Sequence, residues 1–121
     1  MASDRLSKVA QAIKEEVAQI VQREIKDPRI GFVTVTRVNI SADLQHATVY
    51  FSILGDDQKK VKETEAGLKS AAGYVRKLLG QRLHIRVTPQ VIFRADPSIA
   101  ESIRMSKLID DLHQENGEPN G

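Results

Sequence analysis

The chain has no cysteine and no tryptophan, and its few aromatic residues are two tyrosines and three phenylalanines. Without cysteine, neither a disulfide nor a thiolate metal site can form, and the composition suits a reducing compartment. No apolar run approaches the roughly 20 residues that span a bilayer. The first residues, MASDRLSKVAQ, lack the apolar stretch of a secretory signal. We therefore expect a cytoplasmic protein outside the membrane, with a core built mainly from Val, Ile, Leu and Ala.

Acidic residues are also absent from one long segment, between Glu65 and Asp96. This segment carries only basic charges, at Lys69, Arg76, Lys77, Arg82, Arg86 and Arg94. Subtracting these from the 18 Lys and Arg leaves 12 in the rest of the chain, against 16 Asp and Glu. Such a concentration of positive charge predicts a surface that meets an anionic partner. The alternative is a set of ordinary solvated faces, which usually mix both signs.

The length of 121 residues favours one domain with one modest core. Apolar residues at helical spacing predict a first helix that ends near Ile25, before Asp27-Pro28. Two β-branched segments, residues 31–41 and 47–53, predict a hairpin. The apolar phase of the first strand shifts by one residue near Arg37, which predicts a β-bulge. The second strand is expected to point Ala47, Val49, Phe51 and Ile53 inward.

The next helix is expected to start after a cap at Asp56-Asp57 and to stop at Gly80. Its buried stripe is Val61, Leu68, Ala72, Val75 and Leu79. A third strand is predicted over residues 83–93, at a sheet edge because Pro89 lacks an amide donor. Asp96-Pro97 begins a last helix that runs to Leu112. Residues 1–113 thus form one domain, and 114–121 are expected to be a disordered polar tail.

Gly73 interrupts the pattern of the second helix, on the side opposite its buried stripe. Lys69, Arg76 and Lys77 are three or four residues away and share its side of the helix. One explanation is that the helix bends or breaks at Gly73, and the other is that a ligand approaches bare backbone there. Both explanations apply if a kinked helix pair presents its backbone and N-terminal amides to a phosphate chain. Gly73→Ala should then destabilise the fold or impair binding. Gly67 lies in regular helix, and Gly67→Ala should stabilise the fold by roughly 0.5–1 kcal/mol.

The predicted elements give an α+β fold, with helices on one face of a three-stranded sheet. Their order, α-β-β-α-(kink)-α-β with a C-terminal helix, resembles a type II KH domain, an RNA-binding fold with a mixed sheet. The G-x-x-G loop usual in KH domains is missing, since the glycines stand at 67, 73 and 80. Ala71-Ala72-Gly73 instead resembles the A-x-G kink of the ribosome-binding factor A family. Further resemblances are the D-P-R element at 27–29, the P-x-x-x-F spacing at 89–93 and the D-x-S spacing at 96–98.

The resemblance implies a non-enzymatic maturation factor of the bacterial small ribosomal subunit. Such a factor binds free small subunits, assists late processing and folding of small-subunit rRNA near its 5′ end, and matters for growth in the cold. The implied partners are the small subunit and its rRNA, bound by a monomer with no cofactor and no small-molecule substrate. Candidate RNA-binding residues are Lys69, Ala71, Gly73, Arg76, Lys77, Arg82, Arg86 and Arg94. The residues alone indicate only a small α/β RNA-binding protein with a basic surface. The alternatives to the maturation factor are a generic KH-like RNA-binding protein and an adaptor that binds a protein partner with the same basic face.

Other chemistry has weak support in the sequence. His46, His84 and His113 are scattered without ligand spacing, so we expect no metal site. The glycines at 67 and 73 are not followed by the Gly-Lys-Ser/Thr of a phosphate loop. Tyr50 is predicted to face outward from its strand, either as a stacking surface for a base or as ordinary strand surface.

Overall fold

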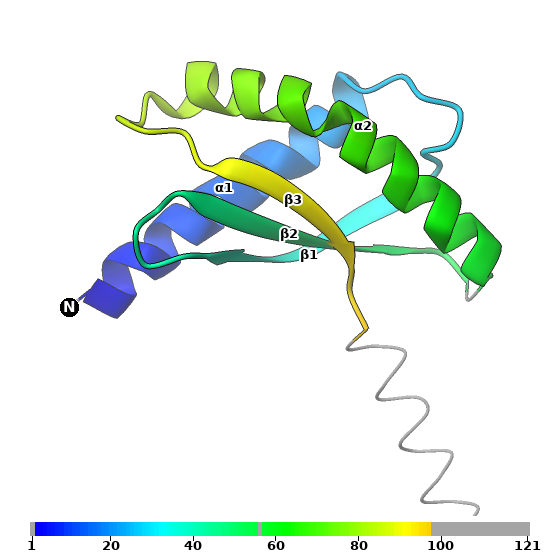
Figure 1. The fold of residues 1–121 in the computed structure, drawn as a ribbon, viewed down its shortest axis with the longest axis horizontal. Coiled ribbons are helices and arrows are strands. Elements are labelled where there is room, and N and C mark those ends of the chain that lie inside the picture. Colours follow the sequence, from blue (N-terminus) through cyan, green and yellow to red (C-terminus); the bar gives the residue numbers. More distant parts are fainter. Residues whose placement is uncertain (1, 56, 98–121) are drawn as a thin grey trace, which may run out of the picture.

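The computed structural model describes residues 2–55 and 57–97 of the chain. Its elements are α1 (Ala2–Arg23), β1 (Val33–Ile40), β2 (His46–Ile53), α2 (Gln58–Leu83) and β3 (Gln90–Ala95). The sheet has the order β1-β2-β3, with β1 antiparallel and β3 parallel to β2. Both helices pack against the same face of this mixed sheet, as the predicted α+β fold requires (Figure 1).

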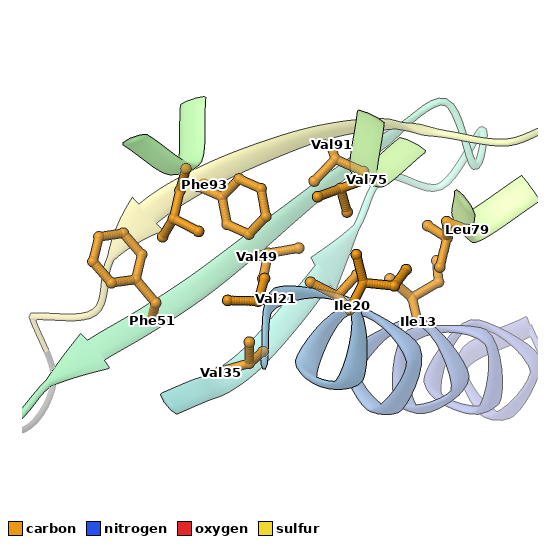
Figure 2. Close-up of a cluster of buried hydrophobic side chains, with 12 residues drawn as sticks. Ile13, Ile20, Val21, Val35, Val49, Phe51, Val75, Leu79, Val91 and Phe93 are labelled. Atoms are coloured by element: carbon orange, nitrogen blue, oxygen red, sulfur yellow. The ribbon is translucent and has the colours of Figure 1, made fainter. Parts of the chain in front are cut away.

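The core lies between the helices and one face of the sheet (Figure 2). It contains Ile13, Val17, Ile20, Val21, Val35, Val49, Phe51, Leu68, Val75, Leu79, Val91 and Phe93. Successive strand side chains point to opposite faces, so every second residue of β2 and β3 reaches the core. Only Phe51 and Phe93 contribute aromatic rings to the cluster, which confirms the aliphatic core predicted from composition.

A β-bulge interrupts the pairing of β1 with β2. Val35 pairs with Phe51 and Arg37 pairs with Tyr50, which leaves Thr36 as the extra residue. The bulge changes the phase of β1, so that Val35 and Val38 both turn toward the core although they are three residues apart. The predicted bulge near Arg37 is confirmed.

Helix α2 is a single helix of 26 residues. It starts at the expected cap, where the side chain of Asp57 accepts a hydrogen bond from the Lys59 amide at 3.0 Å. Helical structure continues through Gly73, so of the two predicted alternatives the break does not occur. Figure 1 shows that α2 changes direction partway along its length, which agrees with the alternative of a bent helix. A glycine costs a helix only about 1 kcal/mol, and buried side chains on both sides of Gly73 hold the helix together.

The predicted helix stop at Gly80 is also wrong, because α2 ends at Leu83 and His84 adopts the left-handed cap conformation with φ of 51°. Gly80 has a packing role instead. A Cβ atom there would lie 2.6 Å from the Oγ1 atom of Thr88. The glycine therefore lets the connection to β3 lie close against the helix.

Strand β3 is shorter than predicted. Leu83 belongs to α2, and residues 84–89 form a connection without strand pairing. β3 pairs with β2 alone, so it lies at the sheet edge as predicted, although Pro89, from which that position was inferred, lies in the connection before the strand. The predicted last helix and the polar tail at 114–121 fall outside the described residues. Within residues 2–55 and 57–97, no helix is long and apolar enough to cross a membrane.

Candidate nucleic-acid interface

The side of α2 away from the core presents a continuous exposed surface. An α-helix turns once in about 3.6 residues, so positions off the buried stripe of Leu68, Val75 and Leu79 gather along this side. We define the α2 ridge as the exposed residues Lys69, Ser70, Gly73, Tyr74 and Lys77. The ridge combines small residues, an aromatic ring and two cations, and it includes the Gly73 position singled out by the sequence.

Gly73 leaves helix backbone bare at the middle of the α2 ridge. A Cβ atom built there would meet nothing within 4 Å, and the backbone does not adopt the left-handed conformation. Neither packing nor strain within the described structure therefore requires glycine at this position. A glycine exposed in this way lets a ligand approach the backbone more closely than any side chain would permit.

Basic side chains flank Gly73 on both sides along the helix. Lys69 has a side chain that is 60% exposed, with its Nζ atom 3.7 Å from Glu65 Oε1. Arg76 donates hydrogen bonds to the Thr88 carbonyl oxygen from Nε at 3.3 Å and Nη2 at 3.0 Å. A carbonyl oxygen orients the guanidinium without neutralising its charge. Lys77 is exposed and forms no ion pair with the described residues, so the charge at Arg76 and Lys77 remains available to an anion.

Arg82 differs from these residues because it meets two carboxylates, one from α1 and one from the residue that follows α1. Its Nη1 atom lies 3.7 Å from Glu16 Oε2, and its Nη2 atom lies 3.5 Å from Glu24 Oε1. The segment that is free of acidic residues in sequence is therefore not free of them in space. Arg82 joins α2 to α1, and much of its charge is already compensated.

The other predicted site residues lie in three different places. Ala71 is half-buried and packs against the core. Arg86 is exposed in the connection before β3, not on a strand as predicted. Arg94 is exposed on the sheet face away from the helices, because Val91 and Phe93 occupy the core side of β3. The structure thus brings together Lys69, Gly73, Arg76 and Lys77, and separates the rest from them.

Tyr74 is a surface residue that the sequence reasoning did not assign to the site. It lies beside Gly73 on the α2 ridge, and it is 46% exposed. Its position outside the stripe of Leu68, Val75 and Leu79 is the signal that pointed to exposure. An exposed aromatic ring next to cations provides a stacking surface for a nucleic-acid base.

The D-P-R element, residues 27–29, contacts the N-terminal half of α2. Arg29 binds the Asp27 carboxylate, with Nη2 and Oδ2 2.7 Å apart, and this hydrogen-bonded guanidinium lowers the pKa of Asp27. The Thr64 hydroxyl donates to the Arg29 carbonyl oxygen at 3.3 Å. Ile30, which follows the element, packs against Gly67. Its Cγ1 atom would lie 2.8 Å from a Cβ atom at Gly67. The element therefore has a structural role, because it helps to fix the position of the helix that carries the ridge.

Sequence comparison identifies the same family as the motifs. Residues 5–109 match the family model of ribosome-binding factor A. The ribosome-binding factor A of Halothermothrix orenii is 42% identical over 115 residues, which cover 95% of this chain and 93% of that protein. The ribosome-binding factor A of Desulfitobacterium hafniense (strain DCB-2) is 41% identical over 121 residues, which cover all of this chain and 96% of that protein.

Solved structures of the family share the fold. A solution NMR structure of a Thermotoga maritima protein described as a putative ribosome binding factor A is 32% identical, with a TM-score of 0.66 over 74% of this chain and 85% of that one. The crystal structure of Thermus thermophilus ribosome-binding factor A is 22% identical, with a TM-score of 0.63 over 74% and 94% of the two chains. Motifs, sequence identity and fold agree, and the chain belongs to the ribosome-binding factor A family.

Proposed function

We propose that this chain binds the small ribosomal subunit by placing the α2 ridge and Arg76 against rRNA. The observation that carries the proposal is the exposed Gly73 backbone, flanked by Arg76 and Lys77 without carboxylate partners among the described residues. A related Thermus thermophilus protein, 22% identical, has been fitted as a homology model into a cryo-EM map of a 30S complex. That relative supports the choice of the small subunit as the partner.

The ridge binds RNA mainly through contacts to the sugar-phosphate backbone of the RNA. Cations that neutralise phosphates release condensed counterions, which makes affinity depend strongly on salt. The bare backbone at Gly73 allows a phosphate to approach the helix closely, while Lys69, Arg76 and Lys77 surround it. Tyr74 adds a face on which an unpaired base stacks.

The finer role follows from the family resemblance. We infer a cytoplasmic, monomeric and non-enzymatic factor that assists late processing of small-subunit rRNA near its 5′ end and supports growth in the cold. Binding chemistry suffices for this role, because a factor that prefers one conformation of the RNA shifts its population toward that conformation.

Co-sedimentation with free small subunits over a range of salt concentrations tests the proposal. With Lys69, Arg76 and Lys77 each contacting one phosphate, the logarithm of affinity should fall with the logarithm of salt at a slope of about −2 to −3. The double variant Arg76→Gln/Lys77→Gln should bind more weakly and flatten the slope by about 1–2. Lys59→Gln/Lys60→Gln removes the same charge from another part of α2 and should have far less effect.

The outcomes separate the candidate functions. Equal losses from the two double variants would mean that only net charge matters, and would contradict the ridge as the binding surface. Binding that persists at high salt would favour the adaptor that grips a protein partner. An absence of co-sedimentation in low salt would contradict small-subunit binding altogether.

A further inference from the structure

The face of the sheet away from the helices carries a row of three large side chains. Arg37 of β1 pairs in register with Tyr50 of β2, and Tyr50 pairs in register with Arg94 of β3. Cross-strand partners point to the same face of a sheet. We define the sheet row as Arg37, Tyr50 and Arg94. Neither the binding surface on α2 nor the core uses these residues.

Arg37 and Tyr50 form an organised pair within this row. The Cζ atom of Arg37 lies over the Tyr50 ring, 4.0 Å from its centroid, and the Arg37 side chain is still 54% exposed. The bulge at Thr36 creates this arrangement, since it is the register shift that brings Arg37 opposite Tyr50. The tyrosine ring occupies one face of the guanidinium, so a base that stacks on Arg37 would use the opposite face.

Asp96 holds Arg37 in this position. Its Oδ2 atom lies 3.5 Å from Arg37 Nε and accepts a hydrogen bond from the Thr36 hydroxyl at 2.5 Å. The Asp96 backbone amide also donates to the Phe51 carbonyl oxygen at 2.7 Å, which fixes the carboxylate beside the end of β2. The Asp96 side chain is only 3% exposed, so it orients the guanidinium without presenting a carboxylate to a ligand.

The described strand positions around the row are mostly polar, apart from the half-buried Ile92 of β3, and they lack exposed carboxylates. Its described strand neighbours on the same face include Thr34, Ser52, Asn39 and Thr48, all of them uncharged. Arg94 adds a second exposed cation on the other side of Tyr50. Asp96 compensates part of the Arg37 charge, so Arg94 supplies most of the positive charge of this face and Arg37 supplies a planar group. A face with this cation, a guanidinium plane and an aromatic ring is complementary to a polyanion that carries flat bases.

We propose that the sheet row is a second RNA contact, at which one unpaired base stacks on the open side of Arg37 and a neighbouring phosphate binds Arg94. Arginine guanidinium planes are stacking surfaces for splayed-out RNA bases. The inference rests on the proposed function of this chain as an rRNA-binding factor. Since the α2 ridge and the sheet row lie on different sides of the molecule, the protein would bridge two RNA segments rather than cover one.

The test uses the full chain and a short single-stranded oligoadenylate, with the same strand paired to oligouridylate as a control. A stacked adenine should shift the Arg37 Nε–Hε signal in an NMR titration, because the ring current of the base acts directly on that group. Single-stranded RNA should produce the shift, and the duplex should not, since its bases are already stacked. An unmoved Arg37 signal at saturating single strand would overturn the proposal.

Matched variants distinguish stacking from charge. Arg37→Lys keeps the charge but removes the plane, and should weaken binding of the single strand by about tenfold. Arg94→Lys keeps the phosphate contact and should bind nearly as well as the wild type. Lys62→Gln removes an exposed charge elsewhere and should have little effect. Retained affinity in Arg37→Lys, with its melting temperature unchanged, would refute a stacking role.

The same variants separate this inference from the proposed function. If wild-type protein co-sediments with small subunits while Arg37→Lys behaves like wild type in both assays, only the sheet row fails. If the wild type does not co-sediment, the proposed function fails. In the double variant Arg76→Gln/Lys77→Gln, the Arg37 signal should still shift with oligoadenylate, because the two surfaces are independent.

Discussion

Two of the three glycines of α2, Gly67 in its N-terminal half and Gly73 in its C-terminal half, have opposite surroundings. Gly67 is buried, and a Cβ atom there would lie 2.8 Å from Ile30 Cγ1 and 3.3 Å from Arg29 Cβ. Gly73 is exposed, and a Cβ atom there would meet nothing within 4 Å. At Gly67 the helix is therefore packed against the chain at Arg29 and Ile30, whereas at Gly73 it presents open backbone to solvent.

The comparison reverses what the sequence predicted for these glycines. Gly67 was expected to be a tolerated residue in regular helix, and it turns out to allow a close approach. Gly73 was expected to need a conformation that alanine disfavours, and the structure shows a helical backbone there without the left-handed conformation. A glycine in a helix can thus serve packing within the molecule or access from outside, and only its neighbours in space distinguish the two.

The largest expected effect is that of Gly67→Ala. The added methyl group must displace Ile30 or Arg29, and overpacking of this kind usually costs about 1–3 kcal/mol. We expect a loss of that size in the free energy of unfolding, measured by urea denaturation. Adding Ile30→Ala should relieve the clash, so the double variant should lose less than the sum of the two single variants. Stabilisation by Gly67→Ala would contradict the contact.

Gly73→Ala should act in the opposite direction on stability. The methyl group enters open space, and alanine is favoured over glycine in a helix by up to about 1 kcal/mol. We expect an increase in the free energy of unfolding together with weaker binding to small subunits, because the methyl group covers the bare backbone. A variant that gains stability and binds unchanged would show that the glycine is not needed for ligand access.

Arg82→Gln should lower stability slightly and leave binding intact. It removes ion pairs to Glu16 and Glu24 at a side chain that is 31% exposed, and pairs of this kind contribute about 0.2–1 kcal/mol. Denaturant melts should show that loss, while the salt slope of subunit binding stays constant. Arg86→Gln, an exposed charge without a structural partner among the described residues, serves as the control for stability. A flattened slope in Arg82→Gln would extend the binding surface toward α1.

The smallest effect concerns Asp27 beside the N-terminal half of α2. The Arg29 guanidinium lowers the Asp27 pKa below its ordinary value of 3.8. A lowered pKa in the folded state stabilises the protein above pH 3.8, and this contribution disappears as the pH falls through the folded pKa. Carboxyl NMR titration of Arg29→Gln should show the Asp27 pKa returning toward 3.8.

Asp43 is an internal reference in that titration. Its pKa is also lowered, chiefly by the hydrogen bond from the Ser41 hydroxyl, and it should not respond to Arg29→Gln. A parallel change at Asp43 would point to a general loss of structure instead of a lost pair.

Local features of the molecule were readable from the sequence alone. The inward residues of β2, the bulge beside Arg37 and the cap at Asp57 all follow from the alternation of side chains or from single-residue backbone chemistry. The signals for these features lie within a few residues of one another along the chain. The basic residues near Gly73 were also found in this way, because three- and four-residue spacing places them on one side of a helix.

Contacts between distant segments were decided only by the tertiary structure. Arg82 meets Glu16 and Glu24, Gly67 meets Ile30, and Gly80 meets Thr88, and each contact depends on how a helix packs against another part of the chain. The registry of Arg37, Tyr50 and Arg94 across three strands belongs to the same class. Periodicity tells which side of an element is apolar, whereas the partner of that side is set by packing among segments far apart in sequence.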